Sequence, residues 1–177
     1  DIGNTSRYYA SFAFNTLGAD SITVAPYMGS DSVGPFLEYE GKWTILLALT
    51  SNKGSQDFQH ASQNDGQPLY AKVMTRAAEW GSADQLMFVC GATQAERFAE
   101  LRTLTPDHFF LVPGIGAQGG DLEGVCKHGM NDHCGLLVNS SRGILYAGDG
   151  EDFAKKARAS ALDLQTKMAD ALKKYLP

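Results

Sequence analysis

Short apolar runs alternate with longer amphipathic stretches along the chain. The apolar runs are rich in branched and aromatic residues and show no hydrophobic/polar alternation. Such runs are typical of strands that are buried on both faces of a parallel sheet. The pattern therefore predicts five buried strands, at Ser21–Ala25, Trp43–Leu49, Gln85–Cys90, Phe109–Val112 and Leu136–Val138.

The amphipathic stretches between these runs carry apolar residues at helical spacing. They predict helices at Ser6–Leu17, Ser32–Tyr39, Pro68–Trp80, Gln94–Leu104 and Asp152–Tyr175. Thr5 or Ser6 is the expected N-cap of the first helix, and the polar segment 51–66 is expected to be a loop that could be mobile. Strands that alternate with helices predict an α/β fold with parallel strands. No break in composition divides residues 1–177, so we expect a single domain.

Composition and charge argue against several classes of function. The net charge is −5 at pH 7 and no basic tract is present, so we expect no nucleic-acid partner. No apolar run is long enough to span a membrane, so we expect no transmembrane segment and no membrane partner. The three cysteines are an odd number, which argues against a disulfide scaffold and fits a reducing compartment such as the cytoplasm.

Cys126, His128, His133 and Cys134 lie close together in the sequence and could mimic a zinc cluster. Their spacing matches none of the usual zinc-finger patterns. We therefore expect a solvated loop here and no bound metal.

Pro113–Asp121, with the sequence PGIGAQGGD, directly follows the fourth expected strand. Its four glycines allow a sharp turn that exposes successive N–H groups, and such groups can bind an anion. An ordinary turn is the alternative. The spacing is not G-x-G-x-x-G, which weakens a dinucleotide-binding interpretation.

Arg142 comes just after the last expected strand. Arginine is suited to bidentate binding of phosphate, although a lone arginine is more often a surface residue. Parallel strands fit either an open doubly wound sheet or an eight-stranded barrel, and phosphate sites of barrels are often built from the loops after strands seven and eight. A glycine-rich loop followed by an arginine therefore favours a barrel whose final strands are present.

Thr50, Ser51 and Asn52 follow the second expected strand. Polar groups at the carboxyl end of a strand are placed to bind a polar ligand, or simply to cap the loop. The spacing alone leaves both interpretations open.

These segments together resemble one family, the orotidine 5′-phosphate decarboxylases. The resemblance is carried by Asp1-Ile2-x-x-Thr5, Leu49-Thr50-Ser51, the Pro113–Gly120 loop and Arg142-Gly143, while VAPYMG at 24–29 is similar to the longer bacterial branch. It implies a homodimer of (β/α)8 barrels with active sites near the subunit interface. The implied reaction converts orotidine 5′-phosphate (OMP) to UMP and CO₂, with no metal or organic cofactor and with a lysine as proton donor.

The resemblance also implies roles for residues in the first half of the chain. Asp1 corresponds to the second aspartate of the family signature D-x-K-x-x-D, a catalytic residue that reaches into the neighbouring subunit's site. Ile2 and Thr5 correspond to substrate-binding positions, with Thr5 at the ribose and phosphate region. Ser51 corresponds to a residue that reads the amide edge of the pyrimidine.

In the second half of the chain, the resemblance implies a phosphate site. Gln118 corresponds to a glutamine that bridges phosphate and base, and Arg142 to the arginine that grips the phosphate. The other substrate-binding positions implied are Pro113, Gly116, Gly119 and Gly143.

The signature lysine would precede Asp1, as would the first three strands of the barrel. We therefore expect the chain to supply about the last five βα units, as the C-terminal portion of a barrel, and to be inactive alone. Two other functions remain open. One is a phosphosugar decarboxylase or synthase of the same superfamily, which would use a metal-bound sugar, and the other is a non-catalytic module that binds a phosphate ligand.

Overall fold

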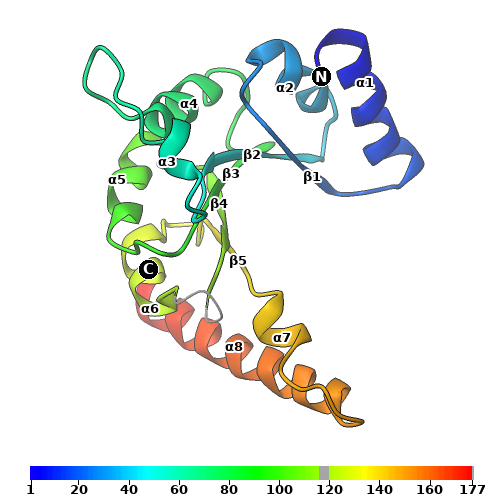
Figure 1. Ribbon diagram of the computed structural model, residues 1–177, viewed down its shortest axis with the longest axis vertical. Coiled ribbons are helices and arrows are strands. Elements are labelled where there is room, and N and C mark those ends of the chain that lie inside the picture. The colour runs from blue at the N-terminus through cyan, green and yellow to red at the C-terminus, as the bar shows by residue number, and fades with distance from the viewer. Residues whose placement is uncertain (116–119, 177) are drawn as a thin grey trace.

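Five parallel strands form one sheet in the computed structural model, which describes residues 1–115 and 120–176. The strands are β1 (Ser21–Val24), β2 (Trp43–Leu49), β3 (Leu86–Cys90), β4 (Phe109–Pro113) and β5 (Leu136–Asn139). They pair in the order β1-β2-β3-β4-β5, with every neighbour parallel (Figure 1). A doubly wound sheet reverses its strand order part-way, whereas the strands of a (β/α)8 barrel are added in one direction. The strand order therefore matches part of a barrel.

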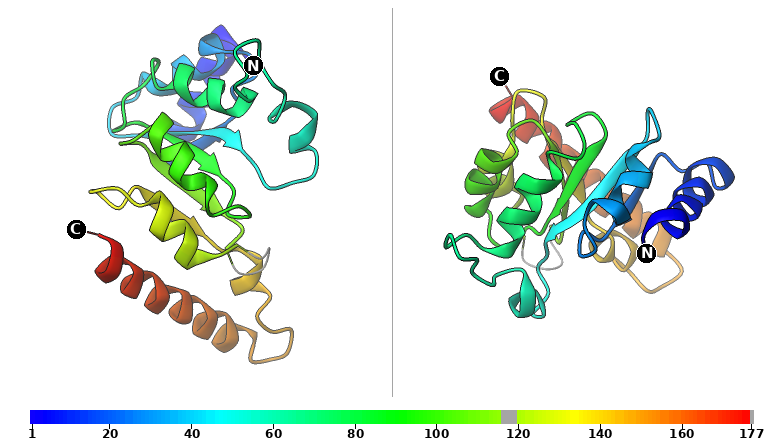
Figure 2. Two further views of the ribbon diagram at one scale, coloured as in Figure 1. Left: turned by 90° about the vertical axis from the view of Figure 1, so that its left-hand side faces the viewer. Right: turned by 90° about the horizontal axis from the view of Figure 1, so that it is seen from above.

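Helices connect the strands and cover the outer face of the curved sheet (Figure 2). The described helices are α1 (Gly3–Ser11), the π-helix η1 (Phe12–Thr16), α2 (Ser30–Leu37), α3 (Ser55–Phe58), α4 (Leu69–Ala77), α5 (Arg97–Leu104), α6 (Leu122–Gly129), α7 (Arg142–Leu145) and α8 (Phe153–Tyr175). None of these described helices is both long enough and apolar enough to cross a bilayer.

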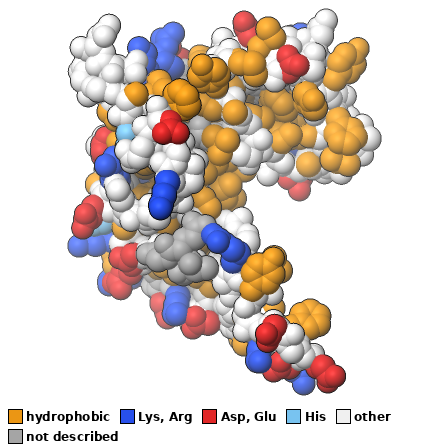
Figure 3. All heavy atoms as spheres, viewed as in Figure 1, with side chains coloured by type: hydrophobic (Ala, Val, Ile, Leu, Met, Phe, Trp, Pro, Cys, Tyr) orange, Lys and Arg blue, Asp and Glu red, His pale blue; other side chains and the backbone are white. Residues whose placement is uncertain are grey.

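The two faces of the sheet are packed differently. On the outer face, Leu46, Phe88 and Phe110 are fully buried against the helices in the main core. On the inner face, Ile45, Met87 and Val89 form a smaller cluster, and no described helix lies across it. A broad hollow with hydrophobic side chains along it opens between the α1–α2 part of the molecule and α7 (Figure 3).

The expectation that all five strands are buried on both faces is wrong for β1 and β5. Ser21 and Thr23 of β1 are exposed, and so are Leu137 and Asn139 of β5. By strand register these positions lie on the inner face of the sheet, where Leu47 of the interior strand β2 is exposed too, because no described helix covers this face. The interior strand β3, by contrast, is buried at every position.

The helix starts expected near the N-terminus also differ. Neither Thr5 nor Ser6 caps α1, because the helix begins earlier, at Gly3, after the extended Ile2. Ser6 is buried instead, and its hydroxyl donates a 2.6 Å hydrogen bond to the Ser32 carbonyl in α2. The side chain that was expected to cap α1 therefore joins α1 to α2.

Three helices were missed. The expected loop 51–66 contains α3, and α7 begins directly after β5. The expected loop around Cys126 is helix α6, in which Cys126 itself is buried. The helices α3 and α7 have only four residues each, which is too short to show a periodic pattern in sequence.

Arg102 links several backbone segments at the amino-terminal side of the sheet. Its guanidinium donates hydrogen bonds to five backbone carbonyls, those of Thr105, Pro106, His108, Gly129 and Gly135. It also lies 4.0 Å over the Phe110 ring. Burial lowers the pKa of Arg102 to about 10, so the group stays charged at neutral pH. The ends of α5 and α6 and the start of β5 are thus fixed by one side chain, opposite the edge that carries the candidate site.

Candidate functional site

All five strands point the same way, so their carboxyl ends lie along one edge of the sheet. The candidate residues Ser51 and Arg142 follow β2 and β5, and both therefore belong to this edge. Ligands of parallel α/β proteins bind at this edge, because loops can vary there without disturbing the sheet. Two cavities open along it.

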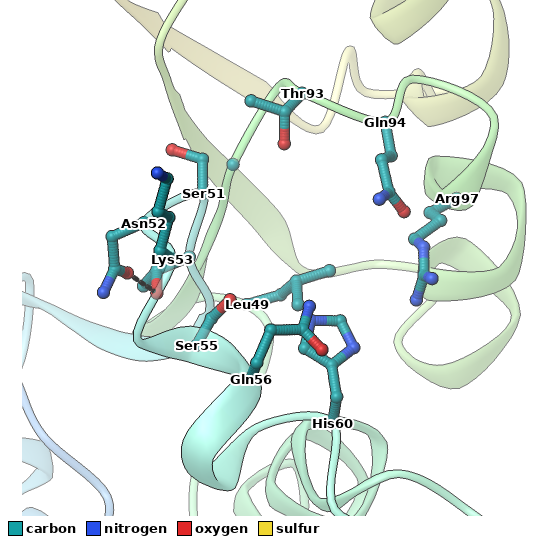
Figure 4. Close-up of a pocket in the computed structure, with 12 residues that line it drawn as sticks. Leu49, Ser51, Asn52, Lys53, Ser55, Gln56, His60, Thr93, Gln94 and Arg97 are labelled. Atoms are coloured by element: carbon teal, nitrogen blue, oxygen red, sulfur yellow. Dashed lines mark hydrogen bonds between the residues drawn. The ribbon is translucent and has the colours of Figure 1, made fainter.

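The first cavity, of about 250 Å³, lies at the ends of β2 and β3 (Figure 4). Ser51, a predicted ligand-binding position, lies on its wall. The residues that line it are Leu49, Thr50, Ser51, Asn52, Lys53, Ser55, Gln56, His60, Gly91, Thr93, Gln94 and Arg97.

Two hydrogen bonds between the Gln59 side chain and Thr50, here called the Gln59 clasp, fix the chain where β2 ends. Its side-chain oxygen accepts the Thr50 N–H at 2.8 Å, and its amide nitrogen donates to the Thr50 hydroxyl at 2.8 Å. The Thr50 hydroxyl in turn donates to Asn52 Oδ1 at 2.5 Å. The turn after α3 therefore fixes the residues on both sides of Ser51.

Gly91 lets β3 approach the same place. A Cβ atom at Gly91 would lie 3.0 Å from the Ser51 backbone nitrogen, closer than nearly all real contacts. The Gly91 N–H donates to the Leu49 carbonyl at 2.8 Å. A side chain here would require the Ser51 backbone to move by a few tenths of an ångström, so the glycine favours the observed close approach.

The second cavity, of about 160 Å³, lies between the ends of β4 and β5. Arg142, at the start of α7, lines it and is exposed, and no hydrogen bond or ion pair holds its guanidinium within the described part of the chain. The other lining residues are Pro113, Gly114, Ile115, Asn139, Ser140 and Ser141. A positive group with several free donors, beside backbone and hydroxyl groups, is suited to an oxyanion.

Gly143 follows Arg142, and its backbone is hydrogen-bonded to α8. Its carbonyl accepts a 2.8 Å hydrogen bond from the Ser160 hydroxyl in α8. The long C-terminal helix thereby supports the short helix that carries Arg142.

The remaining expected positions fall into two groups. Gly116, Gln118 and Gly119 lie outside the described residues. Asp1, Ile2 and Thr5 are exposed at the start of α1, at the β1 end of the sheet, and are not brought together with Ser51 or Arg142 (Figure 1).

Asp1 has a local contact, in which its Oδ1 accepts the Ile2 N–H at 2.8 Å. This bond satisfies a donor just outside the helix, so Asp1 does not act as the helix cap.

Eight residues that line this cavity were not predicted, namely Lys53, Ser55, Gln56, His60, Gly91, Thr93, Gln94 and Arg97. They come from the turn around α3 and from the segment between the end of β3 and the start of α5, where no motif marks them. In the described ranges, no group of three or more histidine, cysteine or acidic side chains could hold a metal ion.

The comparisons with known proteins agree with this geometry. Residues 1–157 match the family model described as "Orotidine 5'-phosphate decarboxylase / HUMPS family". The chain belongs to this family.

Curated members are similar over nearly the whole chain. The orotidine 5′-phosphate decarboxylase of Bacteroides fragilis is 59% identical over 176 residues, which are 99% of this chain and 64% of that protein. That of Flavobacterium johnsoniae is 58% identical over 172 residues, which are 97% of this chain and 63% of that protein. The chain therefore spans just under two thirds of the length of these relatives.

Solved structures of the family share the fold. Leishmania donovani UMP synthase is 40% identical with a TM-score of 0.81, covering 93% of this chain and 37% of that one. Leishmania donovani OMP decarboxylase is 38% identical with a TM-score of 0.77, covering 90% and 61% respectively. The five parallel strands thus match decarboxylase barrels over part of their length.

The Gln59 clasp leads to a test in the intact protein. Gln59→Met removes both bonds to Thr50 and leaves a part-buried N–H without an acceptor, which costs about 1–3 kcal/mol. We expect hydrogen exchange at the Thr50 amide to accelerate by roughly tenfold or more. Gln67→Met, in the same segment but exposed, is the control and should change nothing. Unchanged exchange at Thr50 in the Gln59 variant would show that the clasp is not formed in solution.

Proposed function

We propose that the intact protein decarboxylates OMP to UMP and CO₂, and that this chain supplies its nucleotide-binding edge. The observation that carries the proposal is the placement of Ser51 and Arg142 at the carboxyl ends of β2 and β5 in one parallel sheet. A nucleotide has two different ends to recognise, and two separate polar cavities along the edge provide for them.

The phosphate is assigned to the second cavity. There Arg142 has no described partner to displace, and hydroxyl groups of Ser140 and Ser141 lie beside it. The Pro113–Gly120 loop, with Gly116, Gln118 and Gly119, and Gly143 beyond Arg142 would complete the binding of phosphate. Ser51 would read the amide edge of the pyrimidine from the other cavity.

The chemistry requires stabilisation of a carbanion-like centre at C6 of the base. A lysine ammonium held beside that carbon can stabilise the charge and then donate a proton. We propose that this lysine lies in a part of the protein that precedes Asp1. Phosphate binding at Arg142 is remote from C6, and its energy can be used to position the base against the reacting groups.

We further propose that residues 1–177 are the C-terminal portion of one (β/α)8 domain. Among the described residues, the outer edges of β1 and β5 have no paired strand, and an open edge is a template for pairing with further strands. Three more strands pairing with both edges would close the sheet over the inner cluster of Ile45, Met87 and Val89. The chain alone would then lack both the closed barrel and the lysine, and would be inactive.

The surface around α1 supports a homodimer. Tyr8 is 77% exposed and Phe12, one turn later, is 53% exposed. Ile2 and Tyr9 are also exposed, and Figure 3 shows hydrophobic side chains over this part of the molecule. Contiguous exposed apolar side chains mark an interaction surface, and a two-fold contact here would carry Asp1 to a second subunit.

The description of the matching family also includes HUMPS, so membership of the family alone leaves the phosphosugar alternative open. The curated relatives from Bacteroides fragilis, Flavobacterium johnsoniae and Porphyromonas gingivalis favour the nucleotide enzyme, since each is named orotidine 5′-phosphate decarboxylase. Turnover of OMP by the intact protein separates this enzyme both from a phosphosugar enzyme and from a non-catalytic phosphate-binding module.

Arg142 provides the test of the phosphate assignment. Arg142→Ala should weaken UMP binding by about 1.5–3 kcal/mol, or roughly 10–150-fold, because a charge-assisted contact is lost. Uridine lacks the phosphate, and its affinity should barely change. Titration calorimetry on the intact protein measures both affinities, with Arg158→Ala on the exposed side of α8 as control. Equal weakening of UMP and uridine would contradict the assignment.

Asp1 provides the test of the shared site. Asp1→Asn should reduce turnover strongly without unfolding the protein, because a carboxylate beside an ammonium orients the proton donor. Mixing this variant with one that lacks the catalytic lysine should restore activity. Each heterodimer would contain one site with both defects and one with neither. Heterodimers that form but recover no turnover would count against a shared site.

A further inference from the structure

The cavity at the ends of β2 and β3 has a basic side that the proposed nucleotide does not use. Lys53, His60 and Arg97 all line it, and no aspartate or glutamate is among its lining residues in the described structure. The chain as a whole is acidic, with a net charge of −5. Figure 4 shows the Lys53 side chain beside Asn52 and directed away from His60 and Arg97, so the basic group that requires a separate explanation is His60 with Arg97.

Arg97 is held in place by a buried tyrosine. One guanidinium nitrogen of Arg97 donates to the Tyr70 hydroxyl at 3.2 Å, and that hydroxyl donates to Glu100 at 3.0 Å. Tyr70 is only 2% exposed. Burial and the neighbouring Glu100 raise the pKa of Tyr70, so the hydroxyl remains protonated and the chain of bonds persists at neutral pH. The other guanidinium nitrogens of Arg97 have no hydrogen-bond partner among the described residues.

His60 is fixed by the same tyrosine. The two rings meet edge to face, with centroids 5.7 Å apart. Figure 4 shows His60 and Arg97 on facing sides of the cavity, with the side-chain amides of Gln56 and Gln94 directed to the same space. Hydrogen-bond donors from three different elements therefore converge before any ligand is present, which reduces the entropy lost on binding.

The size of the cavity limits its ligand. Its volume of about 250 Å³ lies below the roughly 300–1,000 Å³ that is typical of sites for drug-sized molecules. We infer that the basic side of this cavity is a binding site for a small oxyanion of the phosphate or sulfate type. It is separate from the cavity of Arg142, with which it shares no lining residue.

The inference does not require the proposed decarboxylase function, because the donors are fixed by Tyr70 and not by a nucleotide. The bound group could be free phosphate or the phosphate of a small metabolite. Inorganic phosphate tests the chemistry that both share, and ribose 5-phosphate separates the two sources by its additional size.

The test uses the intact protein saturated with UMP, so that the Arg142 cavity is filled. Inorganic phosphate is titrated by calorimetry at constant ionic strength, since salt screens exposed charges. We expect one equivalent of phosphate to bind, with affinity reduced tenfold or more in Arg97→Met and partly retained in Arg97→Lys. Arg76→Met removes an exposed arginine that pairs with Glu79 and is the matched control.

His60→Gln is a second variant, because Arg97→Met also removes a hydrogen bond to Tyr70 and could affect folding. It leaves Arg97 and its bond to Tyr70 in place, and phosphate affinity should still fall. Absence of phosphate binding to the UMP-saturated protein would overturn the inference. So would binding that neither variant weakens, or UMP affinity that falls in parallel with phosphate affinity in Arg97→Met.

Failure of the proposed function gives a different result. If UMP does not bind, the same phosphate titration is carried out on Arg142→Met, which removes the competing cation. Phosphate binding that still depends on Arg97 and His60 then supports the oxyanion site, although the nucleotide assignment is lost.

Discussion

Parallel pairing in consecutive order is the constraint on which the rest of the structure depends. Each strand is hydrogen-bonded to the next one in sequence, so each connection must return across the outer face before the next strand begins. The carboxyl ends of all five strands consequently lie along one edge. Ser51 and Arg142 are 91 residues apart in sequence, yet they share this edge because of the pairing alone.

The opposite edge provides the rigidity that the loops lack. Arg102 joins α5, α6 and the start of β5 through backbone carbonyls, where any shorter side chain would leave several acceptors unpaired. The edge that carries the candidate site is fixed instead by separate side-chain hydrogen bonds, such as those from Gln59 to Thr50 and from Ser160 to Gly143. The edge fixed by Arg102 and the edge that carries the candidate site thus lie at different ends of the same strands, as is usual for barrels.

How far the sequence predicts the structure depends on the range of the interaction involved. The strands were located within a few residues because their apolar runs are local features, and the predicted α/β fold is confirmed. The exposure of side chains in β1 and β5 was not predicted, since it depends on which face of the sheet the rest of the fold leaves uncovered. Ser6 was expected to cap α1, but a contact with Ser32, far along the chain, takes its hydroxyl.

The candidate site shows the same division. Ser51 and Arg142 were found because motifs of a known family mark them, and each lines a cavity. Gln59, His60 and Arg97 belong to no motif. Their positions are set by contacts with Thr50 and Tyr70, and these contacts form only in the folded chain. All the roles that the resemblance implies remain predictions, namely those of Asp1, Ile2, Thr5, Ser51, Pro113, Gly116, Gln118, Gly119, Arg142 and Gly143.

The central claim is that one pyrimidine nucleotide spans the edge from β2 to β5. A crystal structure of the intact protein with UMP tests it most directly. We expect the phosphate to lie beside Arg142 and Gly114, and the amide edge of the base to lie within hydrogen-bond distance of Ser51. A phosphate bound between His60 and Arg97, with the Arg142 cavity empty, would contradict it.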